Sequence, residues 1–218
     1  CMNEEFPNAV QYGYINLNVS NNPVMVTRAG EPSWQFSATK NSESYSGFVS
    51  GLNKVPAGTY IITAKSHSSI DVANTVNTYG EPYFEGESAE TEISAGESQS
   101  VEINCGTAKN SKLTLVNNLN NSVFTNVKLN ATSHDRNLSL SSENSSAFYS
   151  IGTTVAYNIN YTYNGEDEKT INNDGENYTI NISTAATDYQ IKLTSTDNGN
   201  IHVSVTYNGE FDTIESED

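Results

Sequence analysis

The stretch that decides the fold class runs from Val155 to Tyr163 and reads Val-Ala-Tyr-Asn-Ile-Asn-Tyr-Thr-Tyr, followed by Asn164-Gly165. Large apolar or aromatic side chains take every second position, and Ala, Asn or Thr takes the positions between them. Successive side chains of a β-strand point to opposite faces, so this alternation predicts a strand with one buried and one wet face. The dipeptide Asn-Gly favours a type I′ turn, which predicts a hairpin after Tyr163.

The same period of two recurs along the chain, and no window of helical length carries a 3.6-residue apolar stripe. The other segments with this alternation are 15–19, 34–38, 60–64, 113–115, 127–131, 138–140, 178–182, 189–193 and 201–207. Short turns rich in Gly, Pro, Asn and Asp separate them. The pattern is typical of antiparallel sheets with one wet side, which predicts an all-β chain. Residues 68–77 fit either a loop or a short helical turn.

A length of 218 residues suits two domains. The first run of strands ends at Cys105 and a new alternation opens at Lys112, which places the boundary near Gly106–Asn110. We therefore predict a flexible N-terminal lead (1–8), a first domain (9–108) and a second domain with an acidic tail (109–218). Each domain is expected to be an antiparallel β-sandwich of immunoglobulin-like or transthyretin-like type. A single long barrel is the alternative.

The charge of the chain excludes one class of partner. Ten basic residues against 26 acidic ones give a net charge of −16 and a pI near 4.4. Nucleic-acid affinity depends on Lys and Arg neutralising phosphates, so no nucleic-acid partner is expected. Mutual repulsion predicts a soluble monomer. Glu166-Asp167-Glu168 could offer oxygen ligands to a divalent cation, but a solvated hairpin tip is the favoured reading and no metal site is predicted.

The two cysteines receive different predictions. Cys105 continues the alternation of Val101 and Ile103, which predicts a small buried side chain. Cys1 stands where a lipoprotein signal peptidase leaves its cysteine, which predicts lipid modification at Cys1 and a membrane as partner. A Cys1–Cys105 disulfide is the rival interpretation.

No catalytic constellation is apparent. The three histidines, His67, His134 and His202, stand singly, without a second histidine or a carboxylate at ligand spacing. None of the common nucleophile, zinc or phosphate-loop motifs is present. The sequence predicts a protein that is not an enzyme and holds no cofactor.

The predicted ligand-binding residues are aromatic. Tyr79, Tyr83 and Phe84 lie in a segment that could present an exposed surface to a sugar ring. The competing interpretation is that this loop packs on its own sheet. Trp34 alternates with Phe36 and Ala38, which favours a place in the core.

Several stretches, in this order, resemble a known family. They are Val55–Ala64 (VPAGTYIITA), Glu81–Gly86 (EPYFEG), Ile93–Gly96 (ISAG), Val101–Cys105 (VEINC), Lys112–Leu115 (KLTL), Ala147–Tyr149 (AFY) and Asp188–Leu193 (DYQIKL). Together they resemble the two-domain surface lipoproteins of Bacteroidales, a family of unknown function often assigned to cell adhesion. The resemblance covers almost the whole chain.

The resemblance implies a lipid-anchored protein of the outer membrane, exposed at the cell surface, that acts as a structural or adhesive module. Two alternatives are a glycan-binding accessory lipoprotein of a polysaccharide-uptake system and a pilus-type subunit that assembles by strand exchange. The expected partner is a glycan or a surface protein. Arg28 lies in a stretch similar to one that is cleaved in pilin-type relatives, and Thr213 lies in a stretch similar to an O-glycosylation motif.

Overall fold

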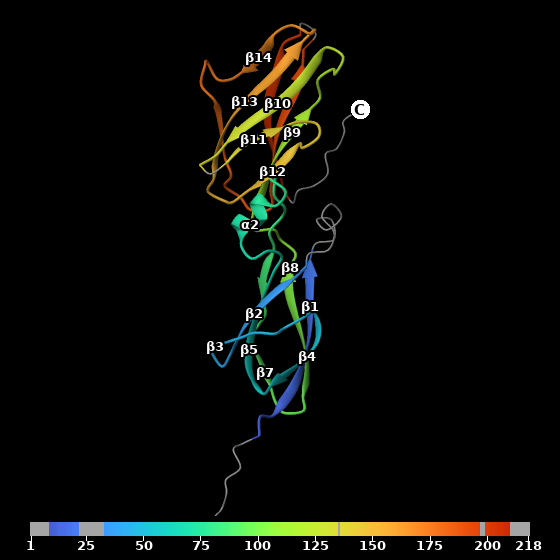
Figure 1. Ribbon diagram of the computed structural model, residues 1–218, viewed down its shortest axis with the longest axis vertical. Helices are drawn as coiled ribbons and strands as arrows, with labels where there is room; N and C mark the ends of the chain where they lie inside the picture. Colours follow the sequence, from blue (N-terminus) through green and yellow to red (C-terminus); the bar gives the residue numbers. More distant parts are fainter. Residues whose placement is uncertain (1–8, 22–32, 135, 197–198, 210–218) are drawn as a thin grey trace, which may run out of the picture. The chain divides into compact units, whose positions relative to one another are not determined.

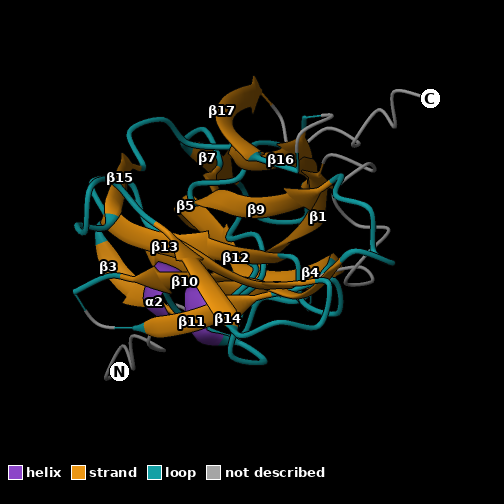
Figure 2. Cartoon of the chain, turned by 90° about the horizontal axis from the view of Figure 1, so that it is seen from above, coloured by secondary structure: helices purple, strands orange, loops and turns teal. Residues whose placement is uncertain are grey.

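The computed structural model describes residues 9–21, 33–134, 136–196 and 199–209 (Figure 1). Strands dominate these residues (orange in Figure 2), which confirms the predicted all-β fold class. The contacts between residues divide the chain into two compact units. Unit 1 consists of Cys1–Ser68 and Phe84–Thr107, and unit 2 consists of Ser69–Tyr83 and Ala108–Asp218.

Unit 1 contains two sheets. In one, β1 (Tyr12–Asn21) lies between β4 (Gly51–Pro56) and β8 (Ser98–Cys105). In the other, β2 (Gln35–Lys40) lies between β3 (Glu43–Tyr45) and β5 (Gly58–Lys65), and β5 also pairs with β6 (Glu85–Glu87) and β7 (Thr91–Ile93). Each strand contributes its apolar face to the interior, so the two sheets form a sandwich.

The core of unit 1 follows the alternation seen in the sequence. Ile15 and Leu17 of β1 and Tyr60 and Ile62 of β5 are at most 2% exposed. Cys105 ends β8 on the same phase as Val101 and Ile103 and is 1% exposed, as predicted. Its Sγ lies 3.8 Å from the carbonyl oxygen of Ala64.

Replacing Cys105 with alanine is expected to cost about 1 kcal/mol of stability, because the change removes one small buried group. The experiment uses a Cys1→Ser background, so that Cys105 carries the one thiol of the chain. Denaturant unfolding measures the loss, and Ser100→Ala on the exposed side of the same strand is the control. A thiol reagent should label folded Cys105 slowly; labelling at the rate of a free peptide thiol would contradict the burial.

Unit 2 also contains two sheets. One runs in the order β11 (Asn137–Leu140), β10 (Phe124–Thr132), β13 (Thr154–Tyr163) and β14 (Glu168–Ile171), with β15 (Tyr178–Asn181) also paired to β13. The other runs in the order β12 (Ser146–Tyr149), β9 (Ser111–Asn117), β16 (Thr187–Ser195) and β17 (Ile201–Gly209). Inward-facing side chains of both sheets form one hydrophobic cluster. Its members include Leu113, Leu115, Leu129, Leu140, Tyr149, Val155, Tyr157, Ile159, Ile180, Tyr189, Ile191 and Leu193.

The hairpin predicted after Tyr163 is present. Asn164 and Gly165 both have positive φ angles, of 49° and 73°, as a type I′ turn requires. The amide of Glu166 donates to the carbonyl of Tyr163 at 3.0 Å and closes the turn. β13 and β14 then pair antiparallel.

Two strand pairs differ from the predicted antiparallel arrangement. β1 pairs parallel with β8 in unit 1, and β9 pairs parallel with β16 in unit 2. Each parallel pair joins strands that are far apart in the sequence, because the intervening chain builds the other sheet and one further strand of the same sheet. The alternation of side chains carries no information on the direction of a partner strand.

The segment Ser69–Tyr83 is grouped with unit 2, although the prediction placed it in the first domain. It holds the short helix α2 (Ile70–Thr75), purple in Figure 2, whose first turn is capped by the hydroxyl of Ser69 accepting from the amide of Val72 at 3.2 Å. The choice left open for residues 68–77 thus falls on a helical turn.

Within the described residues, no helix combines the length and apolarity needed to cross a membrane. The boundary between residues 108 and 109, as a division between independently folding domains, stays a prediction.

Candidate functional site

Three of the predicted site residues, Cys1, Arg28 and Thr213, lie outside the described part of the chain. Lipid modification, proteolytic cleavage and O-glycosylation at these positions therefore stay predictions. The same holds for the Cys1–Cys105 disulfide.

The predicted aromatic ligand site is not an exposed surface. Tyr83 and Phe84 are 4% and 3% exposed, which disagrees with an exposed aromatic surface and agrees with the competing interpretation of a packed loop. Tyr79 is half-buried against the core of unit 2, and its hydroxyl donates to the carbonyl of Ser139 at 3.2 Å. The competing interpretation, a loop that packs on its own unit, agrees with this placement for Tyr79. Ligand binding by this loop is otherwise untested.

A buried amide holds this segment in unit 2. The side chain of Asn110 is fully buried, and its Oδ1 accepts from the amide of Tyr83 at 2.8 Å. Its Nδ2 donates to Oδ1 of Asn74 at 2.8 Å and to the carbonyl of Glu81 at 2.9 Å. One side chain next to the start of β9 thus binds three points of the segment, which fixes its position against the sheet.

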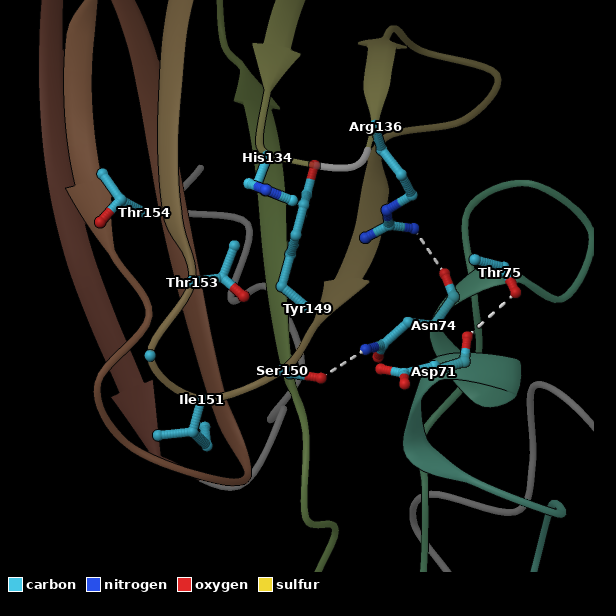
Figure 3. A pocket seen from close by; sticks show the side chains of 11 residues that line it. Asp71, Asn74, Thr75, His134, Arg136, Tyr149, Ser150, Ile151, Thr153 and Thr154 are labelled. Atoms are coloured by element: carbon cyan, nitrogen blue, oxygen red, sulfur yellow. Dashed lines mark hydrogen bonds between the residues drawn. The ribbon is translucent and has the colours of Figure 1, made fainter.

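Arg136 holds α2 from the other side (Figure 3). Its guanidinium donates from Nη1 to the carbonyl of Asn74 and from Nη2 to the carbonyl of Phe148. The same group lies 4.4 Å from the centroid of the Tyr149 ring, a cation–π contact. Asn74 also donates from Nδ2 to the hydroxyl of Ser150 at 2.8 Å. The guanidinium is engaged with backbone carbonyls and an aromatic face, so its role here is to position α2.

A depression of about 470 Å³ lies between α2 and the end of β12 in unit 2. Figure 3 shows Asp71 on the α2 side and His134 on the side of the β10–β11 connection, and Ser150 and Thr153 also line the depression. The lining is mainly polar and includes Arg136, whose guanidinium already donates to the carbonyl of Asn74. The lining can hydrogen-bond to water or to a polar solute. Its charged group Arg136 lies where it holds α2.

Two carboxylates of the acidic hairpin tip, those of Glu166 and Glu168, interact with neighbouring side chains. Lys169 lies 3.0 Å from Oε2 of Glu166, and this hydrogen bond raises the pKa of the ammonium. Oε1 of Glu168 accepts from Nδ2 of Asn160 at 3.0 Å. Across the described residues, no three His, Cys, Asp or Glu side chains gather closely enough to hold a metal ion.

A buried charged cluster lies on the parallel pair β9–β16. The carboxylate of Asp188 is fully buried; its Oδ1 accepts from the hydroxyl of Thr114 at 2.6 Å, and its Oδ2 accepts from Nε2 of Gln190 at 2.9 Å. Oδ2 also lies 3.4 Å from Nζ of Lys112. In register, Lys112 stands opposite Asp188 and Thr114 opposite Gln190. These four side chains occupy the face opposite the core residues Leu113 and Tyr189 and hold the two strands in one register.

Two buried tyrosines have perturbed pKa values. Burial, with a smaller contribution from Tyr45, raises the pKa of Tyr60 to about 12. Burial, followed by smaller contributions from Tyr178 and Tyr207, raises the pKa of Tyr157 to about 12. The hydroxyl of Tyr60 donates to the carbonyl of Pro56 at 2.6 Å. Both tyrosines belong to the cores, so the shifts are consequences of packing.

Stability is therefore expected to fall at alkaline pH. An unfolded tyrosine ionises near pH 10, whereas Tyr60 and Tyr157 ionise near 12 in the folded chain. Their contribution is complete below about pH 10 and is lost as the pH rises from about 10 to 12. Urea unfolding across this range measures the slope, which should be smaller in Tyr60→Phe and Tyr157→Phe than in the exposed control Tyr12→Phe. Equal slopes in all three variants would contradict the pKa assignments.

The outer side of the β4-β1-β8 sheet carries large exposed side chains. We call it the β1 face and define it by the outward residues Tyr12, Tyr14, Asn16, Asn18, Leu52, Lys54, Ser100 and Glu102. Tyr12, Tyr14 and Leu52 are 44%, 37% and 64% exposed. Nζ of Lys54 lies 4.8 Å from the centroid of the Tyr12 ring. The sequence signal for this face is the pair of aromatic residues, Tyr12 and Tyr14, on the polar phase of the first strand.

A depression of about 640 Å³ lies at one end of the β1 face. Asn16, Asn18, Ser100 and Glu102 line it, together with Ser50 and Trp34. Trp34 comes just before β2 and is half-buried, so its expected place in the core is correct only in part. All the lining residues belong to unit 1. The site combines an indole with amide, hydroxyl and carboxylate groups.

The two sandwich-like units and the exposed sheet face define an all-β protein with a surface suited to binding. Residues 35–217 match the model of the DUF4493 family, described as a domain of unknown function. Because this match spans most of the 218 residues, the chain belongs to the DUF4493 family. The expected membership of a family of unknown function is thereby confirmed. No curated protein matches the sequence.

Several solved structures are similar to this chain over most of its length. One, described as a "putative cell adhesion protein" from Bacteroides eggerthii, is 11% identical, with 94% of this chain and 97% of that chain covered and a TM-score of 0.47. A protein of the same description from Bacteroides ovatus is 10% identical, with 95% and 100% covered and a TM-score of 0.47. The fimbrial anchor protein Mfa2 from Porphyromonas gingivalis is 12% identical, with 92% and 98% covered and a TM-score of 0.40.

Proposed function

We propose that this protein is a non-catalytic adhesive module that binds its partner through the β1 face of unit 1. The observation that carries the proposal is the group of large hydrophobic side chains exposed on this face and beside its strands. They are Val10, Tyr12, Tyr14, Val49 and Leu52, with exposed fractions from 37% to 64%. A cluster of apolar side chains in contact with water costs solubility, and such clusters commonly mark sites of interaction.

The composition of the face suits recognition. Aromatic side chains are enriched at protein interfaces because they bury a large area with few rotatable bonds, and a tyrosine also offers a hydroxyl. Tyr12 and Tyr14 project from the central strand of their sheet, where the buried residues Gly13 and Ile15 on the other phase fix the backbone. Two aromatic groups are thus held on a rigid element rather than on a loop, which lowers the entropic cost of binding.

An adhesion assay tests the proposal. Beads coated with the full chain are applied to mucin, to fibronectin and to layers of whole bacterial cells. We expect binding to at least one surface, and loss of most of that binding in the combined variant Tyr12→Ser, Tyr14→Ser and Leu52→Ser. The control is Ile151→Ser in unit 2, an exposed residue outside the β1 face. Failure of wild-type beads on every surface, or full binding by the combined variant, would overturn the proposal.

The cell-surface location is part of the same proposal. A protein that adheres through unit 1 acts at a surface that its partner can reach, and lipid attachment at Cys1 would keep it at the outer membrane. Cys1→Ser, expressed behind a lipoprotein signal peptide and followed by cell fractionation, tests the anchor. We expect the variant to leave the membrane fraction. Retention there would count against lipid attachment at Cys1 and would leave the adhesive role to be judged by the bead assay.

A further inference from the structure

We infer that the depression beside Trp34 on the β1 face binds a neutral oligosaccharide, an inference that rests on the binding role proposed for that face. The depression measures about 640 Å³, which lies within the range of small-molecule sites. It is built within unit 1 from strands β1 and β8 and from the segments that precede β4 and β2. Its described lining combines one aromatic side chain with apolar ones, several uncharged polar ones and the carboxylate of Glu102.

Trp34 supplies the apolar contact. The side chain is half-buried and lines the depression. The face of a sugar ring that carries C–H groups is apolar, and an aromatic face is the surface in proteins that matches it best in shape and size. A half-buried indole offers this surface with a smaller loss of side-chain freedom on binding than a fully exposed one.

The polar groups of the site are available to a ligand. Among the described residues, no hydrogen bond engages the side chains of Asn16, Asn18, Ser100 or Glu102. The asparagines on the outer side of β10 and β13 in unit 2 behave differently, because Asn130 donates to Asn158 at 3.0 Å and these amides satisfy one another. An unengaged amide offers donors and an acceptor together, which matches a hydroxyl that can both donate and accept.

The register of the sheet places these groups side by side. Asn16 stands opposite Ser100 and Asn18 opposite Glu102 in the parallel pair β1–β8. Neighbouring strands lie about 4.8 Å apart. The amide of Asn18 and the carboxylate of Glu102 therefore face outward as neighbours, so that they can bind two hydroxyls of one sugar ring. A carboxylate accepts from two hydroxyls at once, and such charge-assisted bonds are stronger than neutral ones.

The negative charge of the site and of the whole chain favours a neutral ligand over an anionic one. Glu102 is the charged residue of the described lining, and the whole chain carries a net charge of −16. A glycan rich in uronic acid or sulfate would meet repulsion from both. A neutral sugar chain meets no such penalty and can use the amides and hydroxyls fully.

The length of the face indicates several sugar rings rather than one. Tyr12, Tyr14, Asn16 and Asn18 project outward in turn along β1. At about 3.3 Å per residue this row is about 20 Å long. Aromatic groups thus lie at both ends, with Tyr12 and Tyr14 at one and Trp34 at the other. A linear oligosaccharide that follows β1 would contact both ends.

Trp34 gives the test a direct readout, since it is the one tryptophan in the chain. The full chain is titrated with laminarihexaose, maltohexaose, xylohexaose and mannohexaose while tryptophan emission is recorded. We expect at least one of these sugars to change the emission along a saturable curve. Polygalacturonate should produce a much weaker effect. No change with any neutral hexasaccharide would overturn the inference, and equally tight binding of polygalacturonate would overturn the selection by charge.

Variants that keep the fluorophore locate the site. Asn18→Ala combined with Glu102→Ala is expected to weaken the binding by about tenfold, which corresponds to about 1.4 kcal/mol. Gln99→Ala is the matched control, because Gln99 is exposed on β8 but does not line the depression. Unchanged thermal melting shows that the variants fold. Wild-type affinity in the double variant would place the sugar elsewhere and contradict the inference.

The bead assay separates this inference from the proposed function. If adhesion persists in Trp34→Ala and no neutral hexasaccharide changes the emission of Trp34 in the wild type, the sugar site is wrong while the adhesive role stands. If the beads bind no surface but the hexasaccharide still changes Trp34 emission, the adhesive role fails while the sugar site stands. Loss of adhesion in saturating hexasaccharide supports both.

Discussion

Replacing Asp188 with alanine is expected to lower the free energy of unfolding by about 3 kcal/mol, the cost of breaking a buried ion pair by removing one partner. The carboxylate accepts hydrogen bonds from Thr114 and Gln190 and lies beside the ammonium of Lys112. All four residues are at most 9% exposed, so water can replace the lost acceptor only in part. Urea unfolding monitored by circular dichroism measures the loss.

Two further variants make this result specific. Asp167→Ala at the exposed hairpin tip should change stability by no more than about 0.5 kcal/mol. Lys112→Met combined with Asp188→Leu should recover part of the loss, because the two charges no longer need to be desolvated, although Thr114 and Gln190 still lose their acceptor. An unchanged unfolding midpoint in Asp188→Ala would show that the cluster does not stabilise the pair β9–β16.

The second large effect is expected at Asn110. Asn110→Ala removes three buried hydrogen bonds, to Tyr83, Asn74 and Glu81, and should also cost about 3 kcal/mol. The loss has a local signature, since the amide of Tyr83 loses its acceptor. Hydrogen exchange should therefore speed up in Ser69–Tyr83 before it changes in β9.

The control for Asn110 is Asn144→Ala, an exposed asparagine in the loop between β11 and β12. It should leave both stability and exchange within about 0.5 kcal/mol of the wild type. Uniform acceleration of exchange throughout unit 2 in Asn110→Ala, with no early change in Ser69–Tyr83, would mean that the amide does not hold this segment in particular.

The strands and turns could be predicted because they depend on neighbouring residues. The alternation at 155–163 predicted a strand that the structure places at Thr154–Tyr163. The Asn164-Gly165 turn followed from the tolerance of these two residues for positive φ. Burial on alternate sides and turn geometry are both local properties, and one sequence suffices to read them.

The pairing of distant strands could not be read in this way. The parallel partners of β1 and β9 depend on where the rest of each sheet leaves an open edge. The polar phase of β9 and β16 was expected to be wet, but Lys112 and Asp188 are buried. A period of two shows that the faces of a strand differ; it does not show whether the polar face is in contact with water.

The candidate site illustrates the same limit. For the aromatic residues of the apparent loop, the sequence leaves exposure and packing as alternatives, and the structure buries Tyr83 and Phe84. The alternation of Trp34 with Phe36 predicts a place in the core. In the structure Trp34 lies just before β2 and lines a depression. The exposed face at Tyr12 and Tyr14 could be predicted, since a large aromatic residue on the outward phase of a strand already indicates an interaction surface.

The assignment of Ser69–Tyr83 to unit 2 has a consequence for the order of events during synthesis. A ribosome delivers this segment before Phe84–Thr107, which belongs to unit 1, and long before the strands of unit 2. Unit 1 can close once residue 107 has emerged, while the segment that precedes Phe84 still awaits Asn110 and Arg136. If the N-terminal part folds during synthesis, Ser69–Tyr83 therefore stays without its contacts to Asn110 and Arg136 until those residues have been made. A nascent chain arrested at a length at which Thr107 has just emerged from the ribosome should have a protease-resistant unit 1 and a cleavable Ser69–Tyr83.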